Sequence, residues 1–294
     1  MVVPVAAGGA LDSNARLVAD GMRGALGQPV VVENVTGAAG ALGTGRIARA
    51  APDGYSILFG AYATNVLNPA VLTLNYDVAT DFEPIALIGD TPWLFAIKSD
   101  LPASNLRELV QWLRANPDKA TFGTAGHGSP SHIGGALFQQ VTATRFQFIP
   151  YRGTAPVIPD LVSGQIDMAI LDPVTSLPQF RNGRNKILAA MGSKRGTGSQ
   201  DIPTVDEAGV PGVYTEPWQG MWAPKGTPQD AISKVNRAVV SALTDPGIKM
   251  KFAAQSYELT SRENLTPEYL RRFHKAEMDK WIPIIKAAGI KAGG

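Results

Sequence analysis

A short glycine turn near the start of the chain has the residue types and spacing to hold a small anion. Ala7, Gly8 and Gly9 lie between the apolar residues 2–5 and a helical pattern that begins at Leu11. A helix start offers unpaired amide protons and a positive partial charge, and small residues let a ligand approach the backbone. The turn therefore predicts an anion site, and the alternative is a tight strand-to-helix connection that binds nothing.

A second turn at residues 125–132 repeats this arrangement, between an expected strand at 121–124 and an expected helix at 133–141. If the two turns face one another across a cleft, they form a two-sided anion site. Four backbone amides are expected to supply most of the recognition, those of Gly8, Gly9, Gly128 and Ser129.

Helix and strand patterns alternate along the chain, which is typical of an α/β fold with mostly parallel sheets flanked by helices. The first helix is marked by apolar residues at spacings of four, three, four and four: Leu11, Ala15, Val18, Met22 and Leu26. Gly27 can end this helix, and strands are expected at 30–32 and 55–59. Later strands are expected at 82–89, 93–98, 121–124, 146–149, 166–171, 186–191 and 220–223.

Glycine is also frequent at residues 37–45, but this stretch has neither the order of a dinucleotide loop nor a following Gly-Lys-Ser/Thr. Close packing of a helix on its neighbours is the better explanation for these small residues.

Length and composition indicate a globular protein of two domains. The chain has 294 residues, and 45% of them are hydrophobic. The net charge is only +2, and the sequence has no long basic run that would suit nucleic acid. Cysteine is absent, and no apolar run is long enough to span a membrane. We expect residues 1–98 and 220–294 to form one domain and residues 99–219 to form the other.

Catalytic patterns are weak in this chain. Ser129 and His132 suggest a triad, but a nucleophile elbow needs G-x-S-x-G, and Pro130 follows the serine. His127 and His132 lack the H-E-x-x-H spacing of a zinc site, and no G-x-G-x-x-G follows the first strand. We therefore expect no enzyme activity, no cofactor and no metal.

Several motifs then appear in an order that resembles a known family. They are P-x-A-A-G-G-x-x-D at 4–12, G-x-G-S-x-x-H at 126–132, P-Y-R-G at 150–153, G-Q-I-D-M at 164–168, P-T-V-D-E-A-G-V-P-G at 203–212, A-P-K-G-T-P at 223–228 and W-I-P-I-I-K-A-A-G-I-K at 281–291. Together they resemble the Bug family, the extracytoplasmic solute receptors of tripartite tricarboxylate transporters. The resemblance implies a two-lobed periplasmic binding protein of the Venus flytrap type that passes a small carboxylate to a membrane permease. It also implies a periplasmic location after removal of a signal peptide, which this sequence does not show, and we expect a monomer.

The resemblance further implies a set of ligand-binding residues around the two turns. They are Val5, Ala7, Gly8, Gly9, Leu11, Asp12, Tyr62, Thr64, Asn65, Thr124, Gly126, His127, Gly128, Ser129, His132, Tyr151, Arg152, Gly153 and Asp172. Four of them depart from the common pattern or occupy a variable position, and we expect these to set specificity: Val5, Asn65, His127 and Arg152.

Some of these residues have a simpler structural explanation. Asp12 suits a brace for the first helix, because its charge would repel a carboxylate. Ser129 can cap the helix that follows it, His132 can be a packed helix residue, Asp172 can be a turn residue, and Arg152 can be a surface cation.

The ligand itself stays open. Di- and tricarboxylates, aromatic carboxylates, amino acids and nicotinic-type acids all fit a backbone anion site with a variable pocket. A carboxylate sensor that signals to a partner protein would have the same fold, so it is the alternative function.

Overall fold

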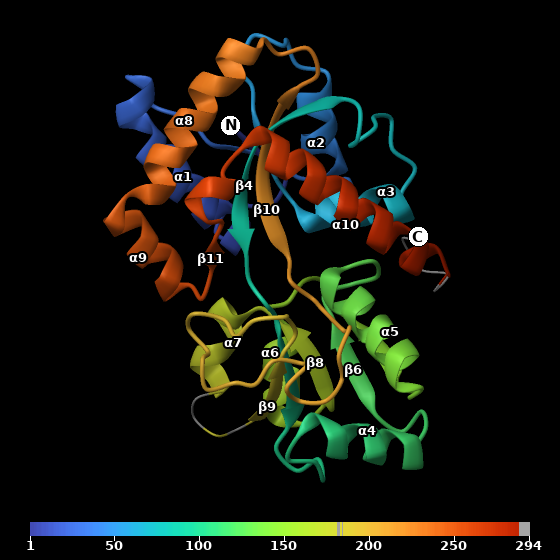
Figure 1. The fold of residues 1–294 in the computed structure, drawn as a ribbon. Coiled ribbons are helices and arrows are strands. Elements are labelled where there is room, and N and C mark those ends of the chain that lie inside the picture. The colour runs from blue at the N-terminus through green and yellow to red at the C-terminus, as the bar shows by residue number, and fades with distance from the viewer. Residues whose placement is uncertain (181–182, 184, 288–294) are drawn as a thin grey trace. The chain divides into compact units, whose positions relative to one another are not determined.

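The computed structural model describes residues 1–180, 183 and 185–287, and these divide into two compact units (Figure 1). Unit 1 contains Met1–Asp90, Trp218–Ala254 and Glu258–Lys286, and unit 2 contains Thr91–Pro217, Gln255–Tyr257 and Ala287. Residues 181, 182, 184 and 288–294 of the two expected domains lie outside the described residues. Both units combine a sheet with helices, which confirms the α/β class.

Unit 1 is built on a six-stranded sheet of order β11-β4-β10-β3-β1-β2. Its strands are β1 (Val2–Val3), β2 (Glu33–Asn34), β3 (Leu58–Ala61), β4 (Phe82–Asp90), β10 (Trp218–Pro224) and β11 (Glu258–Leu259). Its longer helices are α1 (Ala10–Leu26), α2 (Ala41–Ala48), α8 (Gln229–Thr244), α9 (Pro246–Ala254) and α10 (Pro267–Ala287). Shorter helical segments are Ala38–Gly40, Ala63–Leu67, α3 (Asn68–Val71) and Arg262–Asn264.

Unit 2 is built on a five-stranded sheet of order β7-β6-β8-β5-β9. Its strands are β5 (Leu94–Lys98), β6 (Thr121–Thr124), β7 (Gln147–Pro150), β8 (Met168–Leu171) and β9 (Asn185–Ala190). Its helices are α4 (Leu106–Ala115), α5 (Pro130–Thr142), α6 (Val157–Ser163) and α7 (Pro173–Phe180). The sequence patterns did not predict α7, nor α9 and β11 in unit 1.

The sheets are mixed, which corrects the expectation of mostly parallel sheets. In unit 1, β1 is parallel to β2 and β3, whereas β10 is antiparallel to β3 and β4. In unit 2, β6 is parallel to β7 and β8, whereas β5 is antiparallel to β8 and β9. The reason lies in the chain path, because β4 leads out of unit 1 and β10 returns to it in the opposite direction.

Two strand positions in unit 1 also differ from the sequence patterns. The ladder with β1 begins at Glu33, and Val31, in the expected strand 30–32, has 68% of its surface exposed. The third strand runs over Leu58–Ala61, and Tyr55 at the expected start is 78% exposed. An apolar run marks the neighbourhood of a strand, but pairing with the adjacent strand decides its register.

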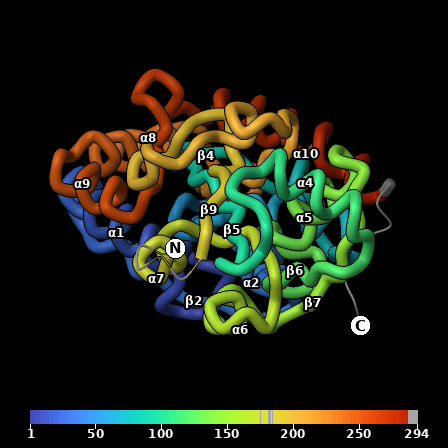
Figure 2. Tube along the Cα trace, turned by 90° about the horizontal axis from the view of Figure 1, so that it is seen from below, coloured from blue at the N-terminus to red at the C-terminus, as the bar shows by residue number. Residues whose placement is uncertain are grey.

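Helices α1, α8 and α9 lie side by side in both views of unit 1 (Figures 1 and 2). Helix α1 has the predicted apolar face, with Ala15, Val18 and Met22 buried, and Gly27 ends it at φ 73°. This left-handed conformation suits glycine, so the predicted end of the helix is confirmed.

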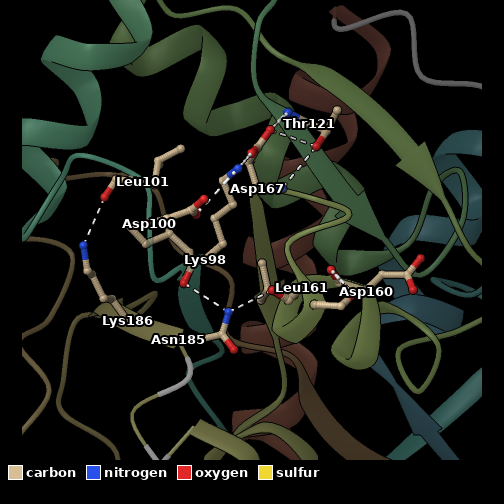
Figure 3. A network of polar contacts seen from close by, with 11 residues as sticks. Lys98, Asp100, Leu101, Thr121, Asp160, Leu161, Asp167, Asn185 and Lys186 are labelled. Carbon is tan, nitrogen blue, oxygen red and sulfur yellow. Dashed lines mark hydrogen bonds and ion pairs between the residues drawn. The ribbon is translucent and has the colours of Figure 1, made fainter.

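A polar network holds one end of the unit 2 sheet (Figure 3). The ammonium group of Lys98 lies 2.9 Å from Oδ1 of Asp167, and Oδ2 of Asp167 accepts the amide and the hydroxyl of Thr121. Nearby, the amide of Asn185 donates to two backbone carbonyls and Lys186 donates to those of Leu101 and Ala103. All these partners stay within unit 2, so the network stabilises the frame that carries α5.

No helix among the described residues combines the length and the low polarity that a membrane span requires.

Candidate functional site

The first glycine turn leads directly into α1 in unit 1. Gly8 adopts φ +91°, a left-handed conformation that other residues rarely take, and no heavy atom lies within 4 Å of the Cβ that a side chain would add there. Gly9 is the N-cap residue of α1, and no side chain caps this helix start. The turn is therefore exposed and open to a ligand.

Asp12 braces this turn from inside unit 1. Its carboxylate accepts the amide of Gly8 at 2.9 Å and the side-chain amide of Asn34 at 2.9 Å, and it pairs with Arg16 at 3.0 Å. The side chain is 4% exposed. Burial alone would raise the pKa of Asp12, but the bonds from Arg16, Gly8 and Asn34 outweigh it and hold the pKa below its usual value. The carboxylate therefore stays ionised and acts as a brace.

Three of the four amides expected to supply the recognition, those of Gly8, Gly128 and Ser129, already have partners within the described chain. The amide of Gly8 donates to Asp12, that of Gly128 donates to Nδ1 of His132 at 3.0 Å, and that of Ser129 donates to the carbonyl of Gly126 at 3.2 Å. The acceptors of these three hydrogen bonds lie four or fewer residues away in the sequence. The described chain supplies no acceptor for the amides of Gly9, Ala10 and Leu11, nor for those of His127 and Ser131.

The second glycine turn connects β6 to α5 in unit 2 and is closed by its own hydrogen bonds. Gly126 and Gly128 have φ +112° and +72°. Oγ of Ser131 accepts the amide of Ala125 at 2.9 Å, and Oγ of Ser129 accepts the amide of His132 at 3.3 Å. Ser129 is therefore the N-cap residue of α5, as one of its two explanations predicted.

The side chain of His132 contacts this turn and the ring of Phe148. Its ring lies edge-on to Phe148, with 4.7 Å between ring centroids, and is 9% exposed. Burial, with a smaller effect of the neighbouring His127, lowers the pKa of His132 to about 4. The neutral ring accepts the Gly128 amide at Nδ1, so Nε2 carries the proton.

This lowered pKa predicts a pH-dependent stability. Below pH 6.5 the unfolded chain protonates His132 while the folded chain does not, so the free energy of unfolding falls by up to about 2 kcal/mol between pH 7 and pH 5. Asparagine places an acceptor near the position of Nδ1 without a titratable ring. Urea unfolding of wild type and His132→Asn at pH 7, 6 and 5 should show a difference that shrinks toward pH 5. A difference that stays constant would contradict this prediction.

The other expected site residues fall into a buried and an accessible set. Tyr62, Thr64, Asn65 and Thr124 are buried at 4% exposure or less. Tyr62 packs against Trp218 and Trp281, with ring centroids 6.3 and 5.7 Å away. These four side chains lie in the interior of their units.

The accessible set includes the residues expected to set specificity in unit 2. Arg152 and His127 are exposed, and Arg152 forms no ion pair within the described residues. Tyr151 donates to Asp160 at 2.6 Å, and burial together with this carboxylate raises the pKa of Tyr151 to about 12. The carbonyl of Asp172 accepts the amide and hydroxyl of Ser176. Val5, Ala7, Leu11 and Gly153 are at least partly exposed.

Comparison with known proteins assigns the family. A family model described as "Tripartite tricarboxylate transporter family receptor" matches residues 14–290. The chain belongs to this family of receptors.

Solved structures of relatives agree over nearly the whole chain. The receptor is 37% identical to the periplasmic binding protein BugD, with a TM-score of 0.84 over 99% of this chain and 97% of that one. It is 32% identical to MatC from Rhodopseudomonas palustris, solved with bound malate, with a TM-score of 0.83 over 97% of both chains. A second R. palustris protein, solved with adipate, is 30% identical, with a TM-score of 0.85 over 99% of this chain and 97% of that one. The periplasmic binding protein fold and the Bug-family resemblance are therefore confirmed, and the family is one of solute receptors, not enzymes.

The sequence patterns missed two side chains that shape the receptor's turns. Asn34, at the end of β2, donates to Asp12 and to the carbonyl of Val5 at 3.1 Å. Oγ of Ser131 accepts a hydrogen bond from the amide of Ala125. The position of Asn34 after an expected strand was the available signal, because strand ends on one edge of a sheet gather polar groups.

Proposed function

We propose that this receptor binds a small dicarboxylate in the periplasm and delivers it to the permease of a tripartite tricarboxylate transporter. The observation that carries the proposal is the uncapped start of α1, where the amides of Gly9, Ala10 and Leu11 point to no acceptor of the described chain. Such donors suit one carboxylate without the cost of burying a lysine. Two relatives at 30% identity or more were solved with dicarboxylates, malate and adipate.

Unit 2 offers further donors of the kind that a carboxylate needs. The hydroxyl of Ser129 and the amides of His127 and Ser131 can donate to a carboxylate, and the guanidinium of Arg152 suits another because its planar fork matches a carboxylate. Asp12 and His132 then act indirectly, by holding the two turns in shape.

The test removes one amide proton and changes little else. Proline is favoured at the first position of a helix, and Gly9 at φ −83° and ψ 172° already has the extended conformation that a following proline requires. We expect Ala10→Pro to weaken adipate or malate binding about 10- to 100-fold, because a charge-assisted hydrogen bond is lost. Calorimetry measures the affinity and urea unfolding confirms that the stability is kept.

Ala10→Ser is the matched control, since it changes the side chain and keeps the amide proton. Equal affinities of the proline and serine variants would refute a carboxylate at the start of α1. Arg152→Gln should weaken dicarboxylates more than monocarboxylates of similar length, which separates the contribution of unit 2 from that of unit 1. A thermal-shift screen identifies the best ligand first, because a hundredfold excess over the dissociation constant adds about 2.7 kcal/mol.

A further inference from the structure

Unit 1 contains a pocket that neither glycine turn lines. It has a volume of about 310 Å³ and lies between one face of α10 and the segment 78–84. Its apolar wall is formed by Val78, Phe82, Pro84, Trp222 and Met278. This volume is at the lower end of the range for small-molecule sites, and such sites combine apolar walls with a few polar groups.

His274 supplies an unused polar atom in this pocket. The residue lines the pocket and is 6% exposed, and its Nε2 lies 2.8 Å from the carbonyl oxygen of Asn65. A carbonyl only accepts, so Nε2 donates and carries the ring proton. Burial, partly offset by that bond, lowers the pKa of His274 below its usual value, so the ring is neutral at pH 7 and Nδ1 is an acceptor. Nδ1 has no hydrogen-bond partner among the described residues.

Cations outnumber anions among the charged side chains that line the pocket. They are Arg271, Lys275 and Asp279, two cations and one anion. Arg271 also pairs with Glu83 at 3.2 Å and Lys275 pairs with Asp279, but both cations are well exposed, at 64% and 75% of their side chains. Exposed ion pairs contribute little free energy and leave other N–H groups of both side chains free to donate.

We propose that this pocket is a second ligand site, for a small aromatic carboxylate that carries a ring hydroxyl. The ring packs against Phe82, Trp222 and Met278, the hydroxyl donates to Nδ1 of His274, and the carboxylate lies at Arg271 and Lys275. Once the ligand ring excludes water from the pocket, Nδ1 of His274 keeps a hydrogen-bond partner only if the ligand carries the hydroxyl, so the hydroxyl discriminates between ligands. The inference does not depend on the dicarboxylate site.

The experiment uses the ring nitrogens of histidine as reporters. The chain has three histidines, and the variants His127→Gln and His132→Asn assign their signals. In ¹⁵N NMR, 4-hydroxyphenylacetate should shift the Nδ1 signal of His274 with a dissociation constant below about 1 mM, equally with and without adipate. Phenylacetate, which lacks the donor, should bind about two- to tenfold more weakly. Tyramine, which replaces the carboxylate by a cation, should not bind.

Variants on the exposed face of α10 provide matched tests. Arg271→Gln should weaken 4-hydroxyphenylacetate, whereas Arg272→Gln, a neighbouring exposed arginine that does not line the pocket, should not. Met278→Trp should fill the pocket and abolish the shift of the His274 signal. No shift at 10 mM ligand, or a shift that adipate abolishes, would overturn the proposal. A response to an acidic tyrosine peptide but not to the free acid would assign the pocket to a protein partner and would also overturn it.

Discussion

Replacing Asp12 by alanine is expected to lower the free energy of unfolding by about 3 kcal/mol and to abolish tight carboxylate binding. The buried carboxylate accepts hydrogen bonds from the Gly8 amide and the Asn34 side chain, and a hydrogen bond to a charged group contributes about 1.5 to 3 kcal/mol. The turn at Gly8 and Gly9 then loses the bond that holds its shape. Urea unfolding and calorimetry with adipate measure the two effects.

Asp20→Ala is the matched control, because Asp20 is an exposed acid on the same helix. It should change the stability by less than about 0.5 kcal/mol. The pH dependence provides a further check. The pKa of Asp12 is lowered in the folded state, so its stabilisation is complete above the usual value near 4 and is lost as the pH falls through the lowered value. If Asp12→Ala matched wild type at pH 7, the brace would not exist.

The second large effect is expected from one added methyl group in α2. Gly43 packs so closely on β1 and its neighbours that a Cβ atom would lie 2.6 Å from the carbonyl oxygen of Val35 and 3.0 Å from Cα of Pro4. Both contacts are backbone atoms that cannot turn aside, so Gly43→Ala should cost at least about 2 kcal/mol. This close approach confirms for Gly43 the expectation that glycine in this stretch serves helix packing.

The same substitution on α1 should have the opposite sign. Gly24 is exposed within the helix, and no atom lies within 4 Å of its Cβ position, so Gly24→Ala should stabilise the protein by about 0.5 to 1 kcal/mol. Urea unfolding followed by tryptophan fluorescence compares the two variants, and unit 1 contributes Trp218, Trp222 and Trp281 to this signal. Two variants that change stability in the same direction would contradict the packing argument.

The sequence alone determined those helix ends that are set by interactions between nearby residues. Asn105 caps α4 by accepting the amide of Glu108 at 2.9 Å. Gly27 and Gly164 end α1 and α6 in the left-handed conformation. These interactions join residues within one or two helical turns, so the local pattern contains all the information they need.

The positions of both glycine turns at helix starts, and the family itself, were also available from the sequence. The motifs that resemble the Bug family extend along the whole chain, and the family match over residues 14–290 confirms them. The α/β class followed from the alternation of helix and strand patterns. Strand direction did not, because an antiparallel return such as that of β10 depends on where the chain re-enters unit 1.

Only the tertiary structure decided which polar groups are free to bind a ligand. The amide of Gly128 was expected to help bind the ligand, and in the folded chain it donates to a histidine ring one helical turn later. Asn34 reaches Asp12 from a strand 22 residues away, and His274 reaches Asn65 across 209 residues. A residue type reveals which hydrogen bonds a group can form, but its actual partner is set by the folded chain, which brings together residues that are distant in the sequence. For the same reason the pocket beside α10 had no signal in the sequence, since its walls come from three separate segments of unit 1.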